Sequence, residues 1–135
     1  MFARKTKSTI DSLIGMSTSI KGDVGFKGGL RIDGQINGNI NAESGPQPSV
    51  LVISEHAKVV GEVRAAHLIV NGEIIGDVHS SELLELQPKA RITGNVYYKA
   101  LEMHGGALVS GKLSHDQAGE TPLLKLAASA SVSEA

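Results

Sequence analysis

The sequence predicts an all-β protein, a single-stranded parallel β-helix (solenoid) of about six rungs, and three observations lead to this fold class. First, the phrase small-x-aliphatic-x-Gly-x-aliphatic occurs six times, with central glycines 15 to 18 residues apart except for one gap of 23. Second, the apolar positions of the phrase fall at spacing two, so an extended chain carries all of them on one face. Third, 41% of the residues are hydrophobic but only 3% are aromatic, which indicates a narrow aliphatic core.

Each phrase is expected to form two short strands with a corner at its glycine, since a residue without a side chain suits a crowded bend. The phrases occupy residues 18–24, 34–40, 57–63, 72–78, 90–96 and 107–113. An aliphatic pair precedes most phrases and predicts a third inward-facing strand in each rung: Leu30/Ile32, Val50/Val52, Leu68/Val70, Leu84/Leu86 and Leu101/Met103. With strands about 4.8 Å apart, such a stack makes a rod about 30 Å long.

The parts of the chain outside the repeat are predicted to be loop or tail. The gap of 23 residues contains Pro46 and Pro48, which cannot donate ladder hydrogen bonds, so it should form a loop at one corner. The predicted organisation is a flexible basic tail over residues 1–15, a β-helix over 16–114 and a flexible tail over 115–135. An antiparallel sandwich is the alternative fold, because the chain also contains Asn-Gly and Asp-Gly turn dipeptides.

Composition excludes several classes of function. A net charge of −1 lacks the basic face that nucleic acid needs, and two Tyr and two Phe provide no stacking platform. The absence of cysteine excludes a disulfide framework. We therefore expect no nucleic-acid partner. The glycine-rich stretch of residues 22–29 lacks the Gly-Lys-Ser/Thr ending of a P-loop, so we expect no nucleotide and no other cofactor.

The histidines do not predict an active site or a metal site. The five are His56, His67, His79, His104 and His115, and none forms an H-x-x-x-H pair. His67 and His79 stand beside aliphatic residues of the repeat and are expected to face solvent. Solenoid acyltransferases use a tight hexapeptide period, which this repeat does not have. We predict that the chain is not an enzyme.

The phrases Ile36-Asn-Gly38-Asn-Ile40 and Ile74-Ile-Gly76-Asp-Val78, in a core of about 100 residues with short polar tails, resemble those of the bactofilins. The resemblance covers almost the whole chain. It implies a right-handed β-helix that polymerises without nucleotide into non-polar filaments of a bacterial cytoskeleton. It also implies a cytoplasmic location, often on the inner face of the cytoplasmic membrane, where such filaments position cell-wall synthesis or remodelling proteins and influence cell shape.

The ends of the predicted rod also indicate that the protein forms a polymer. An uncapped β-helix leaves backbone N–H and C=O groups unpaired at both ends, and stacking of ends satisfies them. No strong capping element is recognisable in the sequence. The inward residues of the terminal phrases are the candidate polymerisation contacts: Ile20, Val24, Val109 and Leu113. The alternative is that the tails fold over the ends and keep the protein monomeric.

The first residues suggest how the polymer reaches a membrane. Phe2, Arg4, Lys5 and Lys7 combine one aromatic side chain with three positive charges, and the resemblance implies a membrane-targeting tail here. An ordinary solvated N-terminus is the alternative interpretation.

A lateral surface is the last candidate site. The alternation predicts that Leu51, Val60, Ile69 and Ile75 point outward and form one apolar patch. A register shift of one residue would instead turn such side chains inward. If the patch binds a partner and the ends are closed, the chain is a soluble monomeric or dimeric β-helical binding module rather than a cytoskeletal scaffold.

Overall fold

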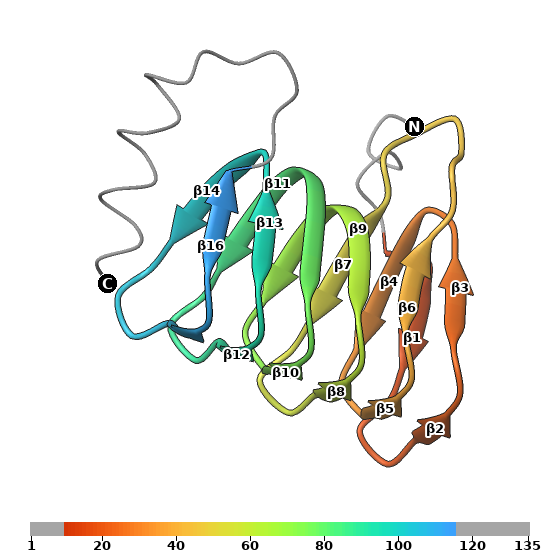
Figure 1. Ribbon diagram of the computed structural model, residues 1–135. Coiled ribbons are helices and arrows are strands. Elements are labelled where there is room, and N and C mark those ends of the chain that lie inside the picture. The colour runs from red at the N-terminus through yellow and green to blue at the C-terminus, as the bar shows by residue number, and fades with distance from the viewer. Residues whose placement is uncertain (1–9, 116–135) are drawn as a thin grey trace.

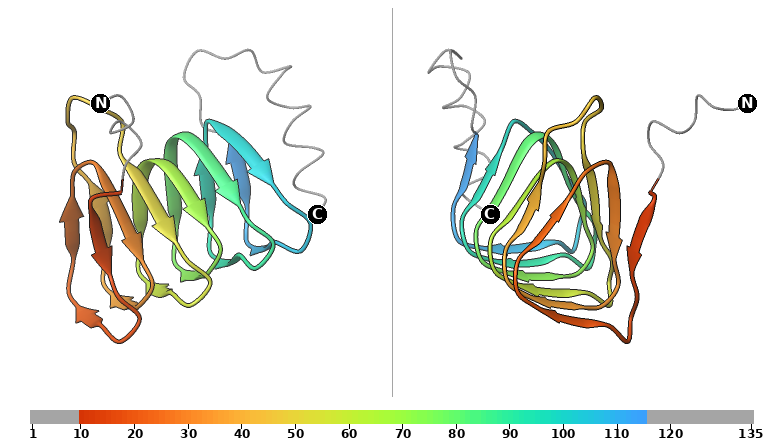
Figure 2. Two further views of the ribbon diagram at one scale, coloured as in Figure 1. Left: turned by 180° about the vertical axis from the view of Figure 1, so that it is seen from behind. Right: turned by 90° about the vertical axis from the view of Figure 1, so that its right-hand side faces the viewer.

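The computed structural model describes residues 10–115, and it confirms the predicted parallel β-solenoid. This part of the chain has sixteen β-strands and no helix. Figure 1 shows the strands stacked into a rod, and in the right panel of Figure 2 successive turns overlie one another as triangular outlines. Two strands, β9 and β11, continue around a corner, so the sixteen strands form six rungs of three sides.

Each side of the triangle is a ladder of parallel strands, one from each rung. The first face contains β1 (Ser12–Ile14), β4 (Gly29–Ile32), β7 (Val50–Ile53), the second halves of β9 (Val63–Val70) and β11 (Val78–Leu86), and β14 (Ala100–Met103). The second face contains β2 (Ser19–Lys21), β5 (Gln35–Asn37), β8 (Lys58–Val60), β10 (Glu73–Ile75), β12 (Arg91–Thr93) and β15 (Leu108–Ser110). The third face contains β3 (Val24–Phe26), β6 (Ile40–Ala42), the first halves of β9 and β11, β13 (Val96–Tyr98) and β16 (Leu113–His115).

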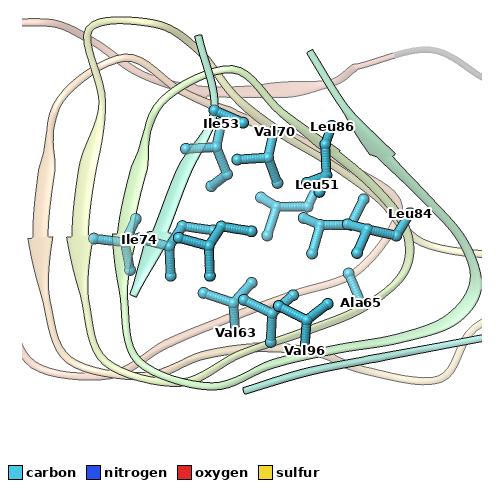
Figure 3. Close-up of a cluster of buried hydrophobic side chains, with 14 of the residues drawn as sticks. Leu51, Ile53, Val63, Ala65, Val70, Ile74, Leu84, Leu86 and Val96 are labelled. Carbon is cyan, nitrogen blue, oxygen red and sulfur yellow. The ribbon is translucent and has the colours of Figure 1, made fainter. Parts of the chain in front are cut away.

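The core is the column of aliphatic side chains that all three faces point inward (Figure 3). The aliphatic positions of the middle phrases are buried as predicted; Val59, Ile74 and Val78 are each 0% exposed. In-register pairing places the equivalent side chain of each rung over that of the last, as with Ile74 between Val59 and Ile92. Each rung therefore buries its apolar side against its neighbours.

Two predicted boundaries are corrected by the strand pairing. The solenoid begins at Ser12 rather than at residue 16, because β1 pairs with β4 and places Ile14 over Ile32. Ile14 packs against the core from this position. At the other end β16 continues through His115 rather than stopping at residue 114.

The predicted inward pair Val50/Val52 is also wrong, by a shift of one residue. In β7 it is Leu51 and Ile53 that are 0% exposed, while Val50 and Val52 are only half-buried. The reason is the pairing with β4, which aligns Leu51 with Leu30. The loop of residues 43–49 absorbs the change of spacing, and in Figure 1 it projects from a corner between β6 and β7.

The corner between the second and third faces depends on the central glycine of each phrase. Gly76 has φ of 149°, and a Cβ there would collide with the carbonyl oxygen of Gly61 in the rung before. The same close approach recurs between successive rungs, at Gly38, Gly61, Gly94 and Gly111. The rungs can thus stack at this corner only because no side chain stands between them.

We predict that Gly76→Ala lowers the thermal midpoint far more than Gly22→Ala does. Both glycines have positive φ, but at Gly22, in the first rung, a Cβ would meet no heavy atom within 4 Å. Gly22→Ala should cost about 1–3 kcal/mol of backbone strain, and Gly76→Ala the same plus a collision with backbone. Circular dichroism melting of both variants measures the difference. Equal decreases in the thermal midpoint would show that the backbone contact between rungs does not restrict the residue at position 76.

A buried charge tests the inward assignment of the strands. Ile92 is 2% exposed, and its neighbour Thr93 points outward on the same strand. Ile92→Asp should cost several kcal/mol, because it places an unpaired carboxylate in the core, whereas Thr93→Asp should change the midpoint little. Unchanged melting of Ile92→Asp would contradict the assignment.

Candidate assembly ends

Among the described residues, the first and last rungs pair on one side only. Within residues 10–115, β1, β2 and β3 pair with strands of the second rung and with no others. At the opposite end of the rod in Figure 1, β14, β15 and β16 pair only with strands of the fifth rung. In this part of the chain, the outer edges of these six strands therefore have no ladder partner.

The described residues leave the core column incompletely covered at both ends. The predicted contact residues Ile20 and Val24 lie in the first rung and are half-buried against the core. Val109 is likewise half-buried in the last rung, and Leu113, 9% exposed, is at the margin of the core. All four point inward as predicted, and their role in polymerisation remains a prediction.

Exposed large apolar side chains also concentrate at the ends. Leu13 and Met16, both in the first rung, are 63% and 64% exposed. Met103 and Leu108, in the last rung, are 39% and 56% exposed. Among the described residues, Val60 is the fifth such side chain, and it alone lies in the middle of the rod. Met103 lies in the inward column beside Leu86, and stacking of ends would remove it from water. Leu13 and Leu108 instead point outward, in the rows of Arg31 and Arg91.

A ladder of side-chain hydrogen bonds follows the glycine corner. The Oδ1 atom of Asp23 accepts from the backbone N–H of Asn39 at 2.9 Å, and Oδ1 of Asn39 accepts from Glu62 at 2.9 Å. The same bonds link Asp77 to Asn95 at 3.0 Å and Asn95 to Lys112 at 3.3 Å. Lys112 has no side-chain acceptor, so the ladder cannot continue beyond the last rung in the same way.

The predicted lateral patch is not one surface. Leu51 lies in the core, because β7 pairs with β4 in the register that aligns Leu51 with Leu30. Val60 and Ile75 are neighbours on the second face, whereas Ile69 lies on the first face beside Val52. The apolar outward residues are therefore divided between two faces. The outward position of Val52 could not be predicted from the sequence, because β7 has four consecutive aliphatic residues and no alternation of apolar and polar positions.

The loop of residues 43–49 forms one wall of an open cleft of about 560 Å³ at the corner between the third and first faces. The other wall includes Arg64, His79 and Glu82. His79 is fixed here by stacking on Tyr97, with ring centroids 4.7 Å apart, and by a 3.2 Å contact with Glu62. This histidine is half-buried rather than freely solvated.

Outward charges mostly compensate one another along the rod. On the second face Lys58, Glu73 and Arg91 are successive partners of alternating sign. At a neighbouring corner Lys89 lies 2.9 Å from Glu55, two rungs away, and this hydrogen bond lowers the pKa of the Glu55 carboxyl. Such pairs lie on the surface, where each contributes little to stability.

The predicted membrane tail, Phe2, Arg4, Lys5 and Lys7, lies outside the described residues. Within residues 10–115 we find no helix that is long and apolar enough to cross a membrane.

A parallel β-solenoid whose first and last rungs are uncovered within residues 10–115 belongs to the class of open-ended solenoids, which present both core and backbone at their ends. Comparison with known proteins then gives the family. The chain matches the family model Bactofilin, described as polymer-forming cytoskeletal, over residues 12–114. The chain therefore belongs to the bactofilin family, and the predicted resemblance is confirmed.

A curated relative agrees with this assignment. Bactofilin BacO of Myxococcus xanthus (strain DK1622) is 23% identical over 115 residues, which cover 85% of this chain and 87% of the relative. No solved structure matches the chain.

Proposed function

We propose that this protein is a cytoskeletal scaffold that assembles end to end, without nucleotide, into filaments. Membership in a polymer-forming cytoskeletal family supports self-assembly. The end-to-end mode rests on one observation: in residues 10–115 the strands of the first and last rungs pair on one side only, and inward aliphatic side chains there, such as Ile20 and Val109, are only half-buried. Stacking two ends would pair these strand edges and extend the aliphatic column, as rungs do within one molecule.

A charge at the inward margin of a terminal rung tests this mode. Leu113→Glu and Ile20→Glu should each stop growth at one end and yield short oligomers, because the carboxylate would lose water as the ends closed. Folding should be affected less, since each residue lies at one end of the core. Sedimentation and negative-stain microscopy measure assembly, and far-ultraviolet circular dichroism measures folding.

Matched controls separate charge from position. Ser110→Glu and Ser19→Glu add the same charge to the same rungs, but on exposed outward positions. These controls should form long filaments. If Leu113→Glu and Ile20→Glu also form long filaments, end-on assembly is excluded and the outward surface around Val60 and Ile75 becomes the better candidate.

We also propose that the filaments bind the inner face of the cytoplasmic membrane through Phe2, Arg4, Lys5 and Lys7. Each positive charge near an anionic leaflet contributes about 1 kcal/mol, so a single tail binds weakly. A filament displays many tails and gains from their effective concentration. Location in the cytoplasm and at this membrane is consistent with these charges.

Deletion of residues 2–7 should abolish co-pelleting with acidic liposomes and leave filaments intact. Deletion of residues 129–135, which include no lysine or arginine, is the matched control and should retain liposome binding. Undiminished pelleting of the N-terminal deletion would support a solvated terminus without membrane function.

A membrane-bound filament would serve as a scaffold. We propose that it positions cell-wall synthesis or remodelling proteins and so influences cell shape, with no catalytic role of its own. This part of the proposal is supported by the structural, cytoskeletal character of the family.

A second candidate function is a soluble monomeric or dimeric binding module. The open cleft between the loop of residues 43–49 and the wall containing Arg64 favours it, since clefts of this size hold ligands in other proteins. Microscopy of the purified protein distinguishes the two functions. Filaments support the scaffold, and a compact particle at all concentrations and salt conditions supports the module.

A further inference from the structure

Two carboxylates lie side by side on the first face, near the C-terminal end of the rod. Glu85 of β11 and Glu102 of β14 are direct partners in the parallel register. They point outward, since Leu84 and Leu86 on either side of Glu85 are buried. Neighbouring strands are about 4.8 Å apart, and like charges directly opposite one another destabilise a sheet. A nearby positive charge would therefore stabilise the pair.

Two basic side chains face each other elsewhere on the rod, and there the protein supplies a carboxylate between them. Arg64 and His79 are also direct partners in the register, on the third face. The Glu62 carboxylate lies 3.4 Å from Nη2 of Arg64 and 3.2 Å from Nε2 of His79, and it bridges the two. Among the ion pairs of residues 10–115, none joins Glu85 or Glu102 to a lysine or an arginine.

A third side chain, an imidazole, completes the cluster. Nε2 of His104, the residue after β14, lies 3.7 Å from Oε2 of Glu85. Ligand atoms of Glu85, Glu102 and His104 all lie within 4.8 Å of one another. The side-chain amide of Gln87 donates to Glu85 and orients its carboxylate, as outer hydrogen bonds commonly orient metal ligands.

We propose that Glu85, Glu102 and His104 bind a zinc ion that joins the last two rungs. One imidazole and two carboxylates are zinc ligands, and three protein ligands leave a fourth position for water. Zinc bonds of about 2.0–2.2 Å require the ligand atoms to draw together, which the exposed Glu102 and His104 side chains can do. The inference departs from the sequence-based expectation that no histidine binds metal.

The ion would act as a clasp between β11 and β14. It would neutralise the two facing carboxylates and fix the outermost strand of the first face to the rung beneath it. Since the three ligands converge only when the rungs are stacked, zinc would bind the folded state preferentially and stabilise it. Magnesium prefers octahedral oxygen ligands and dehydrates reluctantly, so the imidazole favours zinc.

The test uses the full chain without an affinity tag, titrated with ZnCl₂ and separately with MgCl₂. Calorimetry should detect one zinc site per chain, and zinc should raise the thermal midpoint while magnesium does not. Glu102→Gln and His104→Gln remove ligands at exposed positions, and each should weaken zinc binding at least about tenfold. His56→Gln is the matched control, because His56 is also exposed and lies 3.6 Å from a glutamate, Glu55, that Lys89 already neutralises.

Cobalt gives a second readout that folding alone does not change. Co²⁺ bound by His104 and two carboxylates should produce visible absorption bands, which His104→Gln should remove and His56→Gln should keep. The proposal is overturned if the parent protein binds no zinc. It is overturned equally if Glu102→Gln and His104→Gln both bind zinc as the parent does.

Discussion

The structure depends on close backbone contact between successive rungs at one corner. At Gly76 the space that a Cβ would need is occupied by the carbonyl oxygen of Gly61, and the next rungs repeat this contact. Because the corner admits no side chain, each turn must lie directly over the last. This alignment brings the aliphatic positions into columns, as with Val59, Ile74 and Ile92, and the columns form the core.

A core built in this way has no natural end. Each inner rung is covered on both sides, whereas the described first and last rungs are covered on one side only, so Ile20 and Val109 remain half-buried. A Cβ built on Gly22, in the first rung, would meet no heavy atom of the described residues within 4 Å. The forces that stack rungs within one molecule, apolar burial and parallel hydrogen bonding, are therefore also available between molecules. The proposed assembly uses the same interaction as folding.

Since folding constrains the inward positions, the outward surface can vary from rung to rung. The outward row of the second face alternates in charge from Lys58 to Arg91, and a loop at one corner forms the wall of a cleft. Within residues 10–115, Glu85 and Glu102 are facing carboxylates that no lysine or arginine pairs with. The groups that could bind other molecules along the rod, such as the charged row, the cleft and the carboxylate pair, thus lie on its outward surface.

The sequence by itself determined the fold class, the number of rungs and most inward residues, because a repeated phrase with a glycine at its corner permits few other arrangements. Only the tertiary structure decided the register of β7, where four consecutive aliphatic residues fit either face until pairing with β4 selects Leu51 and Ile53. Pairing across rungs likewise recruited Ser12–Ile14 as a strand. It also brought His104 to Glu85, residues that are distant along the chain and meet only because one rung lies over the other.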